Sequence, residues 1–405
     1  MTCSIDGKDL TPNAHLLIAP SVPVWIDGDF LVFDRKYYDG VLLYLKKWGS
    51  KVSCVMNKSD SKQPDFGVVS VRHAALPFNC IVLENKELIS EEHIKETNIV
   101  LASADSFDQL HVSKLCKKLN IKCVYIIEYI PETRYQMVSV GTNNPILKLR
   151  RFLYVWNGER RRRAALSMSD GIQANGMPAY KEYKNHSNTL LYFDTRVNRS
   201  MYIAEKELLN RLKRLSDKSK PIRLAFSGRL TAVKGTDHLI ELAIQLKALG
   251  VDCIFDIYGD GDQFSLLEKQ IVKNNLGSAV VLHGSVSFNE VLLPEIQNRA
   301  DIFICCHRQS DPSCTYMETL SCGVPILGYN NKALIGILEL ADVGWSVEMD
   351  DIKSLAKMVV FLDKNRDEVQ TKSTAAYHFA QKHCFEDVYN ERINHLSSIA
   401  LNQDV

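Results

Sequence analysis

Short apolar, β-branched runs alternate along this chain with longer stretches in which apolar residues recur at helical spacing, a pattern that few folds satisfy. In the first half, strands are predicted over 15–19, 51–56, 80–83, 99–102, 121–127, 172–174 and 189–192. Helices are predicted over 34–48 and 106–120, followed by a long basic helix over 145–168. Strand–helix–strand repetition of this kind indicates βαβ units built around a parallel sheet.

A second series of the same kind follows Pro221. Its predicted strands are 222–227, 253–258, 280–283, 302–305 and 325–328, and helices are predicted between them over 236–249, 263–275, 289–297 and 313–322. We therefore predict an α/β fold of two doubly wound, Rossmann-like domains that face each other across a cleft. The expected boundaries are an N-terminal domain over 1–200, a charged and partly helical link over 201–221, a C-terminal domain over 222–375, and a last helix within 376–405 that crosses back to the N-terminal domain.

Composition supports a globular protein with two unlike halves. With 46% hydrophobic and 24% charged residues, the 405-residue chain is neither disordered nor fibrous. Its net charge of +1 conceals 33 basic and 24 acidic residues in 1–220 against 16 and 24 in 221–405. The eleven cysteines lack zinc-binding spacing, and no apolar run is long enough to span a bilayer. We expect a cytoplasmic protein whose only membrane contact is peripheral.

The predicted strand ends of the second series carry the clearest site candidates, because ligands bind at the carboxyl edge of open α/β sheets. After the first strand, Gly228 permits close backbone approach, and Arg229 and Lys234 place two cations beside a helix N-terminus. This arrangement suits a diphosphate, although two solvated surface cations would give the same pattern. Gly259 and the segment 283–286 follow the next two strands and could equally be ordinary turns.

The segment 307–328 is the most polar of these loops. Its Asp-Pro-Ser at 311–313 opens a helix whose N-terminus, with the hydroxyls of Ser313 and Thr315, could face an anion. Glu318 stands among apolar residues, so its carboxylate requires a partner, which a ribose diol could supply.

Four motifs carry a resemblance to a known family. They are Ser-Gly-Arg-Leu…Lys-Gly at 227–235, Tyr-Gly-Asp-Gly at 258–261, His-Gly-Ser-Val at 283–286 and Glu-Thr-Leu-Ser-Cys-Gly-Val-Pro-Ile at 318–326, in that order. Over 222–345 the chain resembles the donor domain of retaining GT-B glycosyltransferases, specifically glycosyltransferase family 4 (glycosyl transferases group 1). The first half resembles that family mainly in architecture.

The resemblance implies a role for each matching position. Arg229 and Lys234 would bind and stabilise the donor diphosphate, Glu318 would hold the ribose hydroxyls, and Val286 would lie along the base. The remaining donor-binding positions are Gly228, Gly259, Ser313, Cys314 and Thr315.

One position departs from the family pattern. The family places a glutamate eight residues before the position of Glu318, and this chain has Ser310 there, with Asp311 as the nearest acid. Asp311 is predicted to replace that glutamate as a catalytic or sugar-orienting carboxylate. The alternative is that Asp311 caps the helix.

The acceptor side is expected in the N-terminal domain. Asp39 and Gly40 follow the long first loop, and Glu128 and Arg134 follow the predicted strand 121–127, where the family usually has a histidine. Glu128 is predicted to be catalytic and Arg134 to bind acceptor, with a structural ion pair as the alternative. Asp194–Arg196 near the domain crossover is a weaker candidate of the same kind.

The implied function is transfer of a sugar from a nucleotide-sugar donor to a hydroxyl of a glycan, such as a lipid-linked oligosaccharide in bacterial surface polysaccharide synthesis. The resemblance implies neither a cofactor nor a metal. The residues predicted to be catalytic are Arg229, Lys234, Asp311 and Glu128. Two alternatives stay open: a nucleotide-sugar epimerase or hydrolase of the same fold, and an inactive nucleotide-sugar-binding scaffold.

A basic stretch with aromatic residues spans Lys148–Arg163. It could rest on an anionic membrane surface or form an ordinary solvated helix face. We expect no nucleic-acid partner, because no recognised nucleic-acid-binding motif accompanies it.

Overall fold

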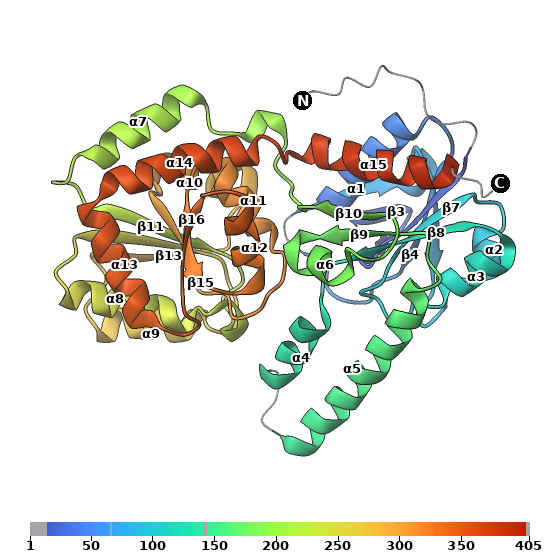
Figure 1. Ribbon diagram of the computed structural model, residues 1–405, viewed down its shortest axis with the longest axis horizontal. Coiled ribbons are helices and arrows are strands. Elements are labelled where there is room, and N and C mark those ends of the chain that lie inside the picture. Colours follow the sequence, from blue (N-terminus) through green and yellow to red (C-terminus); the bar gives the residue numbers. More distant parts are fainter. Residues whose placement is uncertain (1–13, 65–66, 141–143, 402–405) are drawn as a thin grey trace.

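The computed structural model describes residues 14–64, 67–140 and 144–401. Two parallel sheets lie side by side, each flanked by helices (Figure 1). The α/β fold with two doubly wound domains is thereby confirmed.

The first sheet has seven strands in the order β10-β9-β8-β7-β1-β4-β6. Their bounds are β1 Leu16–Ala19, β4 Val52–Asn57, β6 Asn79–Leu83, β7 Ile99–Ser103, β8 Lys122–Ile127, β9 Gly171–Asn175 and β10 Thr189–Tyr192. All five residues of β7 are buried, as expected for the centre of a parallel sheet covered on both faces. The helices of this half are α1 Arg35–Trp48, α2 Glu91–Ile94, α3 Val112–Leu119, α4 Pro131–Val140, α5 Pro145–Leu166 and α6 Gly176–Tyr183.

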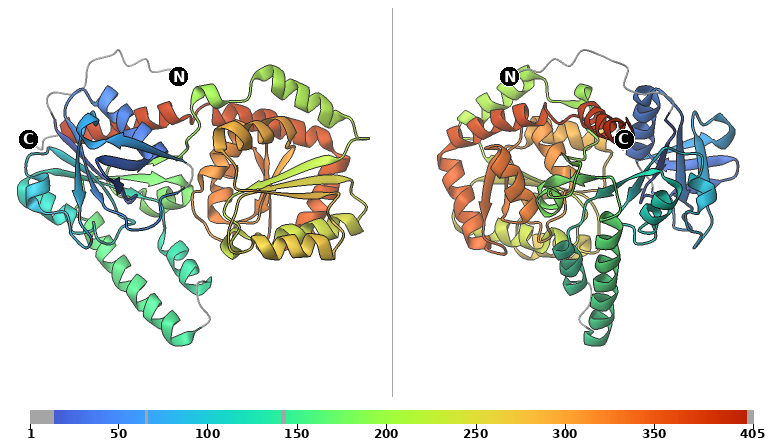
Figure 2. Two further views of the ribbon diagram at one scale, coloured as in Figure 1. Left: turned by 180° about the vertical axis from the view of Figure 1, so that it is seen from behind. Right: turned by 45° about the vertical axis from the view of Figure 1, so that its right-hand side comes forward.

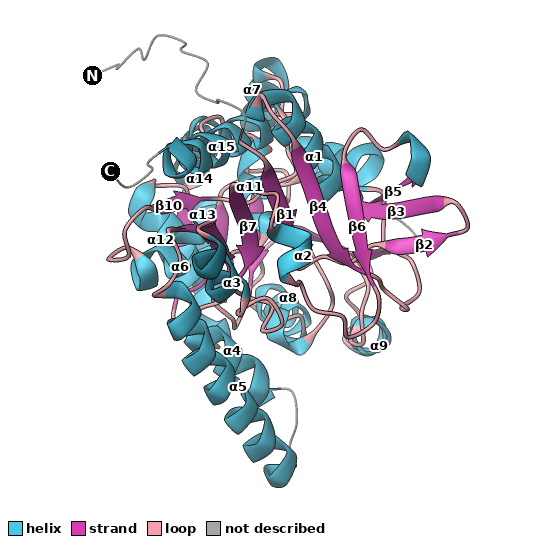
Figure 3. Ribbon diagram, turned by 90° about the vertical axis from the view of Figure 1, so that its right-hand side faces the viewer, coloured by secondary structure: helices cyan, strands magenta, loops and turns pink. Residues whose placement is uncertain are grey.

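Residues 20–33, expected to be one long loop, instead contribute to a small antiparallel sheet beside β6 (Figure 3). It consists of β2 Trp25–Asp27, β3 Phe30–Asp34 and β5 Val68–Arg72. Gly28 and Asp29 form the two-residue turn between β2 and β3, and Gly28 has φ 56°. Glycine at the first turn position is a recognised signal for such a hairpin, so the expectation overlooked local turn chemistry.

The second sheet has six strands in the order β13-β12-β11-β14-β15-β16. They are β11 Ile222–Ser227, β12 Cys253–Tyr258, β13 Val280–Gly284, β14 Ile302–Cys305, β15 Ile326–Tyr329 and β16 Gly344–Val347. The flanking helices are α8 Asp237–Ala248, α9 Phe264–Lys273, a π-helical turn Phe288–Leu292, α10 Leu293–Arg299, α11 Cys314–Ser321, α12 Lys332–Leu340 and α13 Ile352–Lys364.

Helices α7 (Glu205–Ser216), α14 (Arg366–Ala380) and α15 (Phe385–Leu401) lie outside the two series of strands and helices described above, and each packs on one of the two halves. The segment expected as a link contains α7, which packs on α10 and on α14 of the second half. Helix α15 instead packs on α1 and β10 of the first half (Figure 1). Its apolar residues belong to the core of that half, with Leu396 fully buried.

Helices α4 and α5 form a hairpin that projects from the body of the molecule, as both views of Figure 2 show. The predicted helix 145–168 is thus present as α5, and its first half projects away from the first sheet (Figure 2). Stacking of Tyr135 on Phe152, with ring centroids 5.4 Å apart, joins the two helices.

Candidate functional site

A groove at the carboxyl ends of β11, β12 and β13 brings most of the predicted donor-binding residues together. Its volume is about 280 Å³. The predicted residues that line it are Gly228, Arg229, Gly259, Val286, Thr315 and Glu318.

Two glycines let the backbones at the floor of this groove approach each other. Gly228 has φ 153° and Gly259 has φ 127°, and a Cβ on Gly259 would lie 1.9 Å from the carbonyl oxygen of Gly228. No larger residue fits at Gly259 without moving the backbone. At both positions the lack of a side chain therefore allows close approach, and the two backbones approach each other.

Arg229 and Glu318 line the same groove but differ in exposure and in hydrogen bonding. The side chain of Arg229 is exposed. Glu318 is 8% exposed, and its Oε1 accepts a hydrogen bond from Arg196 Nε at 2.7 Å. The guanidinium carbon of Arg196 also lies 4.7 Å from the ring centroid of Phe288, which lines the groove. Burial lowers the pKa of Arg196, but Glu318 and other groups outweigh it and raise that pKa overall.

Lys234 and Asp311 do not line the groove and pair with each other. Lys234 Nζ donates to Asp311 Oδ2 at 3.0 Å, and their side chains are 9% and 14% exposed. The residue at the N-cap of α11 is Ser313, not Asp311. Ser310, at the position of the missing glutamate, accepts a hydrogen bond from the backbone N–H of Lys332 at 3.1 Å. Asp311 thus has an ion-pair role that the sequence did not indicate.

The first residues of α11 face the N-terminal half. Ser313 lies with Asn175, Gly176 and Asp194 at the contact between the two halves. Cys314 Sγ lies 3.5 Å from Lys36 Nζ, and burial raises the pKa of its thiol to about 12.

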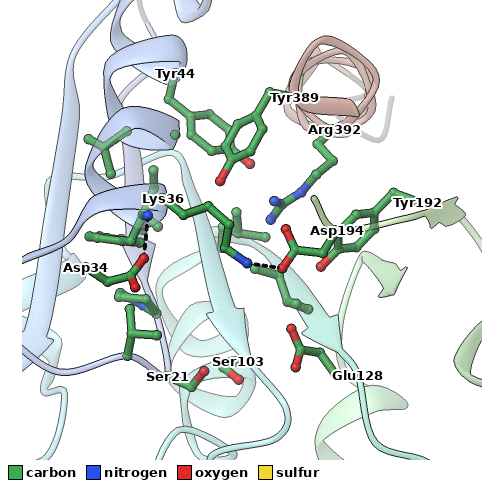
Figure 4. A pocket seen from close by; sticks show the side chains of 18 of the residues that line it. Ser21, Asp34, Lys36, Tyr44, Ser103, Glu128, Tyr192, Asp194, Tyr389 and Arg392 are labelled. Carbon is green, nitrogen blue, oxygen red and sulfur yellow. Dashed lines mark hydrogen bonds and ion pairs between the residues drawn. The ribbon is translucent and has the colours of Figure 1, made fainter. Parts of the chain in front are cut away.

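A cavity of about 130 Å³ lies at the carboxyl edge of the first sheet and is closed by α1 and α15 (Figure 4). The hydroxyls of Tyr44 and Tyr389 and the guanidinium of Arg392 point into it from these helices. Lys36 pairs with Asp194 on its opposite side, and Glu128 approaches from the end of β8. We call this cavity the acidic–tyrosine chamber.

Glu128 contributes a titratable carboxyl group to this chamber. Burial, reinforced by the negative charges of Asp105 and Asp194, raises the pKa of Glu128 to about 7. Asn175 Nδ2 donates to its Oε1 at 3.4 Å. Asp194 behaves in the opposite way: burial raises its pKa, but Lys36 outweighs burial and lowers it overall. A carboxyl group that ionises near pH 7 can accept or donate a proton under cellular conditions.

An interdomain groove of about 870 Å³ joins the two sites. It shares Lys36 with the acidic–tyrosine chamber and shares Arg196 and Phe288 with the groove at the ends of β11, β12 and β13. Asp39 lines this interdomain groove, whereas Gly40 lines the chamber and packs under Tyr389.

Arg134 lies away from these spaces in a buried ion network. Its Nη2 lies 3.0 Å from Asp105 Oδ1, and its Nε lies 3.1 Å from Glu159 Oε1. Its guanidinium carbon also lies 4.4 Å from the ring centroid of Phe107. This is the ion pair that the sequence left open as the alternative to acceptor binding.

Sequence reasoning missed several residues that the fold brings to the site: Lys36, Tyr44, Asp105, Tyr389 and Arg392. Lys36 lies in the first turn of α1, two residues after its N-cap Asp34 and at the sheet edge where ligands bind, so its position was a usable signal. Tyr389 and Arg392 are more than 190 residues from Asp194, and no local pattern could bring them to it.

Within the described residues, no group of three or more His, Cys, Asp or Glu side chains could hold a metal ion. No helix in the same part of the chain is long and apolar enough to cross a membrane.

Comparison with known proteins places this geometry in context. Residues 210–378 match the family model "Glycosyl transferases group 1". Alpha-D-kanosaminyltransferase of Streptomyces kanamyceticus is 27% identical over 125 residues, which is 31% of this chain and 32% of that protein. The putative colanic acid biosynthesis glycosyltransferase WcaL of Salmonella typhimurium is 26% identical over 169 residues, 38% of this chain and 40% of that protein.

The match covers only 21% to 40% of the length of such curated relatives. The fold is shared over a greater length. The crystal structure of Anabaena HepE in complex with UDP superposes with a TM-score of 0.64 at 14% identity, covering 95% of this chain and all of that chain. The chain therefore shares the fold of that structure over nearly its whole length, and its residues 210–378 are similar to the glycosyl transferases group 1 family.

Proposed function

We propose that this protein is a retaining glycosyltransferase that moves a sugar from a nucleotide-sugar donor to a hydroxyl of a glycan acceptor. The observation that carries the proposal is the donor groove, where Gly228, Arg229, Gly259, Val286, Thr315 and Glu318 converge from four separate segments of the chain. Those segments contain the motifs on which the family resemblance rests. UDP-sugars are the first donors to test, because HepE was crystallised with UDP.

The donor groove supplies binding and charge stabilisation. The exposed guanidinium of Arg229 would contact the diphosphate, and the N-terminal N–H groups of α11 would add a partial positive charge. Arg196 holds one oxygen of the Glu318 carboxylate, which leaves the other for the ribose hydroxyls. Lys234 would act from behind Arg229, with Asp311 fixing its position.

The acceptor would lie in the interdomain groove, whose volume of about 870 Å³ suits an oligosaccharide better than a single sugar. Its reactive hydroxyl would face the acidic–tyrosine chamber, where Glu128 could accept a hydrogen bond or a proton. Transfer with retention needs no protein nucleophile if the departing diphosphate leaves on the same face that the acceptor enters. Catalysis would then depend on positioning and electrostatics, without a metal.

We further propose that the acceptor is lipid-linked and that transfer takes place at the cytoplasmic face of a membrane. The name of WcaL, which refers to colanic acid biosynthesis, supports a role in polysaccharide assembly. The projecting hairpin α4–α5 supports a membrane location.

The decisive experiment measures release of free nucleoside diphosphate from nucleotide sugars with and without candidate glycan acceptors. We expect release that depends on acceptor and forms one glycoside per diphosphate. Release without acceptor would indicate a hydrolase, and donor conversion without release would indicate an epimerase. Tight donor binding with no reaction across a broad acceptor panel would favour the scaffold alternative. Adding EDTA tests metal independence and should leave the rate unchanged.

A further inference from the structure

The outer half of α5 exposes an ordered apolar stripe. Ile146, Leu149, Leu153 and Trp156 have exposed fractions of 73%, 61%, 57% and 52%. Their spacing of three, four and three residues places them on one side of the helix. Single exposed apolar residues are common, but a contiguous row on a projecting helix marks a surface that contacts something.

The charge around this stripe has one sign. Arg150 lies four residues after Ile146, and Arg160 lies four residues after Trp156, so both flank the row. Both side chains are exposed. The sequence from Thr133 to Gly158 contains no acidic residue. The outer half of α5 therefore combines an apolar row with an excess of positive charge.

The base of the hairpin is fixed to the candidate active site. Arg162 of α5 is fully buried, and its Nη1 donates to the carbonyl oxygen of Tyr129 at 2.5 Å. Its Nη2 lies 2.6 Å from Glu159 Oε2. Asp105 Oδ2 accepts the backbone N–H of Glu128 at 2.6 Å, and Asp105 also pairs with Arg134 of α4. The same network thus holds both hairpin helices and the backbone of Glu128, so the hairpin has a defined direction relative to the chamber.

We propose that the α4–α5 hairpin docks on the surface of an anionic lipid bilayer through Ile146, Leu149, Leu153 and Trp156, with Arg150 and Arg160 at the headgroups. Apolar residues that enter the interface beside cations that meet anionic lipid are the defining features of interfacial helices. Trp156 has the amphipathic ring that favours this depth. The docking itself does not depend on any catalytic step. Its purpose rests on the proposed function, because docking would bring a lipid-linked acceptor to the cleft.

The charges argue against a second copy of the chain as the occupant. Two hairpins packed along this stripe would bring arginines of both copies together without acidic partners on the outer half of α5. Paired helices normally use opposite charges beside the apolar seam. An anionic bilayer instead supplies the missing negative charge over the whole hairpin.

The test is co-sedimentation of the full-length protein with vesicles of phosphatidylcholine alone or with one-third phosphatidylglycerol. The wild type should bind the mixed vesicles, bind the neutral ones much less, and be released by high salt. Arg150→Gln/Arg160→Gln should lower the partition constant about 25-fold, at about fivefold for each charge near the surface. Leu149→Gln/Leu153→Gln should abolish binding, and mixed vesicles should shift the fluorescence of Trp156 to the blue in the wild type but not in this variant.

Matched controls separate this docking from general charge and hydrophobicity. Lys46→Gln/Lys47→Gln removes two exposed cations from α1, and Leu209→Gln/Val272→Gln removes two exposed apolar side chains from elsewhere. Both should bind like the wild type. All variants should keep the wild-type melting temperature and nucleoside diphosphate affinity, so failure of the docking and failure of the proposed function are distinguishable.

Two outcomes would overturn the proposal. The first is a wild type that does not bind anionic vesicles, or hairpin variants that bind as well as it does. The second is a wild-type dimer that Leu149→Gln/Leu153→Gln dissociates in light-scattering measurements, which would make the stripe an interface between copies of the chain.

Discussion

Arg229 and Lys234 stand five positions apart and carry the same charge, yet the fold gives them different surroundings. Arg229 is exposed in the donor groove, whereas Lys234 is buried against Asp311. Arg229→Ala should therefore lower turnover by about 100- to 1000-fold without a change in stability, as expected for loss of one charge-stabilising donor. Lys234→Ala should lower both turnover and the free energy of unfolding, because it leaves the Asp311 carboxylate without its partner.

Steady-state kinetics and denaturant unfolding of the two variants would test this difference. Asp311→Asn separates the roles of Asp311 further. A catalytic carboxylate predicts a loss of tenfold or more in turnover, whereas a residue that only positions Lys234 predicts a smaller loss, because Asn can still accept its hydrogen bond. Wild-type turnover in Arg229→Ala would place the diphosphate elsewhere.

Glu128 gives the site a pH dependence. If its carboxylate accepts the acceptor proton, the rate should rise about tenfold per pH unit below pH 7 and level off above it, because its pKa is raised to about 7. Glu128→Gln should be slow and should lose this limb, whereas Glu132→Gln, on the exposed start of α4, should keep it.

The free energy of unfolding should also depend on pH because of Glu128. Because the pKa of Glu128 is about 7 in the folded protein and ordinarily 4.5, the folded state binds this proton more tightly than the unfolded state. Its contribution to the free energy of unfolding is present in full below pH 4.5 and is lost as the pH rises through 7. The difference between wild type and Glu128→Gln should follow that course in urea unfolding. An unchanged pH–rate profile in Glu128→Gln would remove this residue from the reaction.

Arg196 is predicted to position Glu318 for the ribose. Glu318→Gln should weaken the free nucleoside diphosphate as well as the sugar donor and should abolish discrimination against the 2′,3′-dideoxy nucleotide. Arg196→Gln should weaken the nucleotide about tenfold, in line with loss of one charge-assisted hydrogen bond. Arg196→Lys should restore part of that loss, although Lys cannot stack on Phe288 as a planar guanidinium does. Isothermal titration with the two nucleotides measures each effect, and equal discrimination in wild type and Glu318→Gln would reject the ribose contact.

Among the secondary-structure elements, the hairpin α4–α5 owes its direction to one buried arginine. Arg162→Ala would leave the carboxylates of Glu159 and Asp105 buried with one cation fewer, and should lower the free energy of unfolding by about 3–5 kcal/mol. Arg163→Ala, one position further along and exposed, should change it by less than about 0.5 kcal/mol. Denaturant unfolding of the two variants gives the comparison, and equal effects would mean that the network does not hold the hairpin.

The strands of both parallel sheets could be predicted from sequence because each is an apolar run bounded by turn residues. β10, β11, β12 and β14 have the predicted bounds, and the other predicted strands differ from these bounds by one residue at one or both ends. The edge strand β16 was not predicted. The predictions failed where a local signal was present but competed with a longer pattern. The hairpin β2–β3 has strands of three and five residues, too short for an apolar run to be distinctive. Likewise α3 begins at Val112 rather than 106, because the Gln109 side chain bonds the backbone of Ser103 and Pro20 and fixes a non-helical turn.

At the scale of the whole molecule, the groove at the edge of the second sheet could be predicted from sequence, whereas the acidic–tyrosine chamber could not. The donor groove is built from motifs whose order and spacing lie within one domain. The acidic–tyrosine chamber combines Lys36 of α1, Glu128 after β8, Asp194 after β10 and Arg392 of α15. Such a cluster depends on where α15 returns to the first sheet, and sequence periodicity does not determine that placement.

Contacts between the two halves lie at the same cleft. Lys332 pairs with Glu132 and Lys181 pairs with Glu339, and a Cβ on Gly176 would lie 2.7 Å from Pro312 Cβ. The ion pairs are half-exposed, so each contributes little to stability. The two ion pairs therefore add little to the contact between the halves, in which α6 packs on α12.

The central claim is that the groove around Arg229 and Glu318 binds the nucleoside diphosphate of a sugar donor. Thermal unfolding of the wild type and of Arg229→Ala, each with saturating UDP, GDP, ADP, dTDP and CDP, tests it most directly. At 100 times its dissociation constant, the correct nucleotide should stabilise the wild type by about 2.7 kcal/mol, and the same concentration should have little effect on Arg229→Ala. A wild type that no nucleotide stabilises, or a variant stabilised as much as the wild type, would contradict the account.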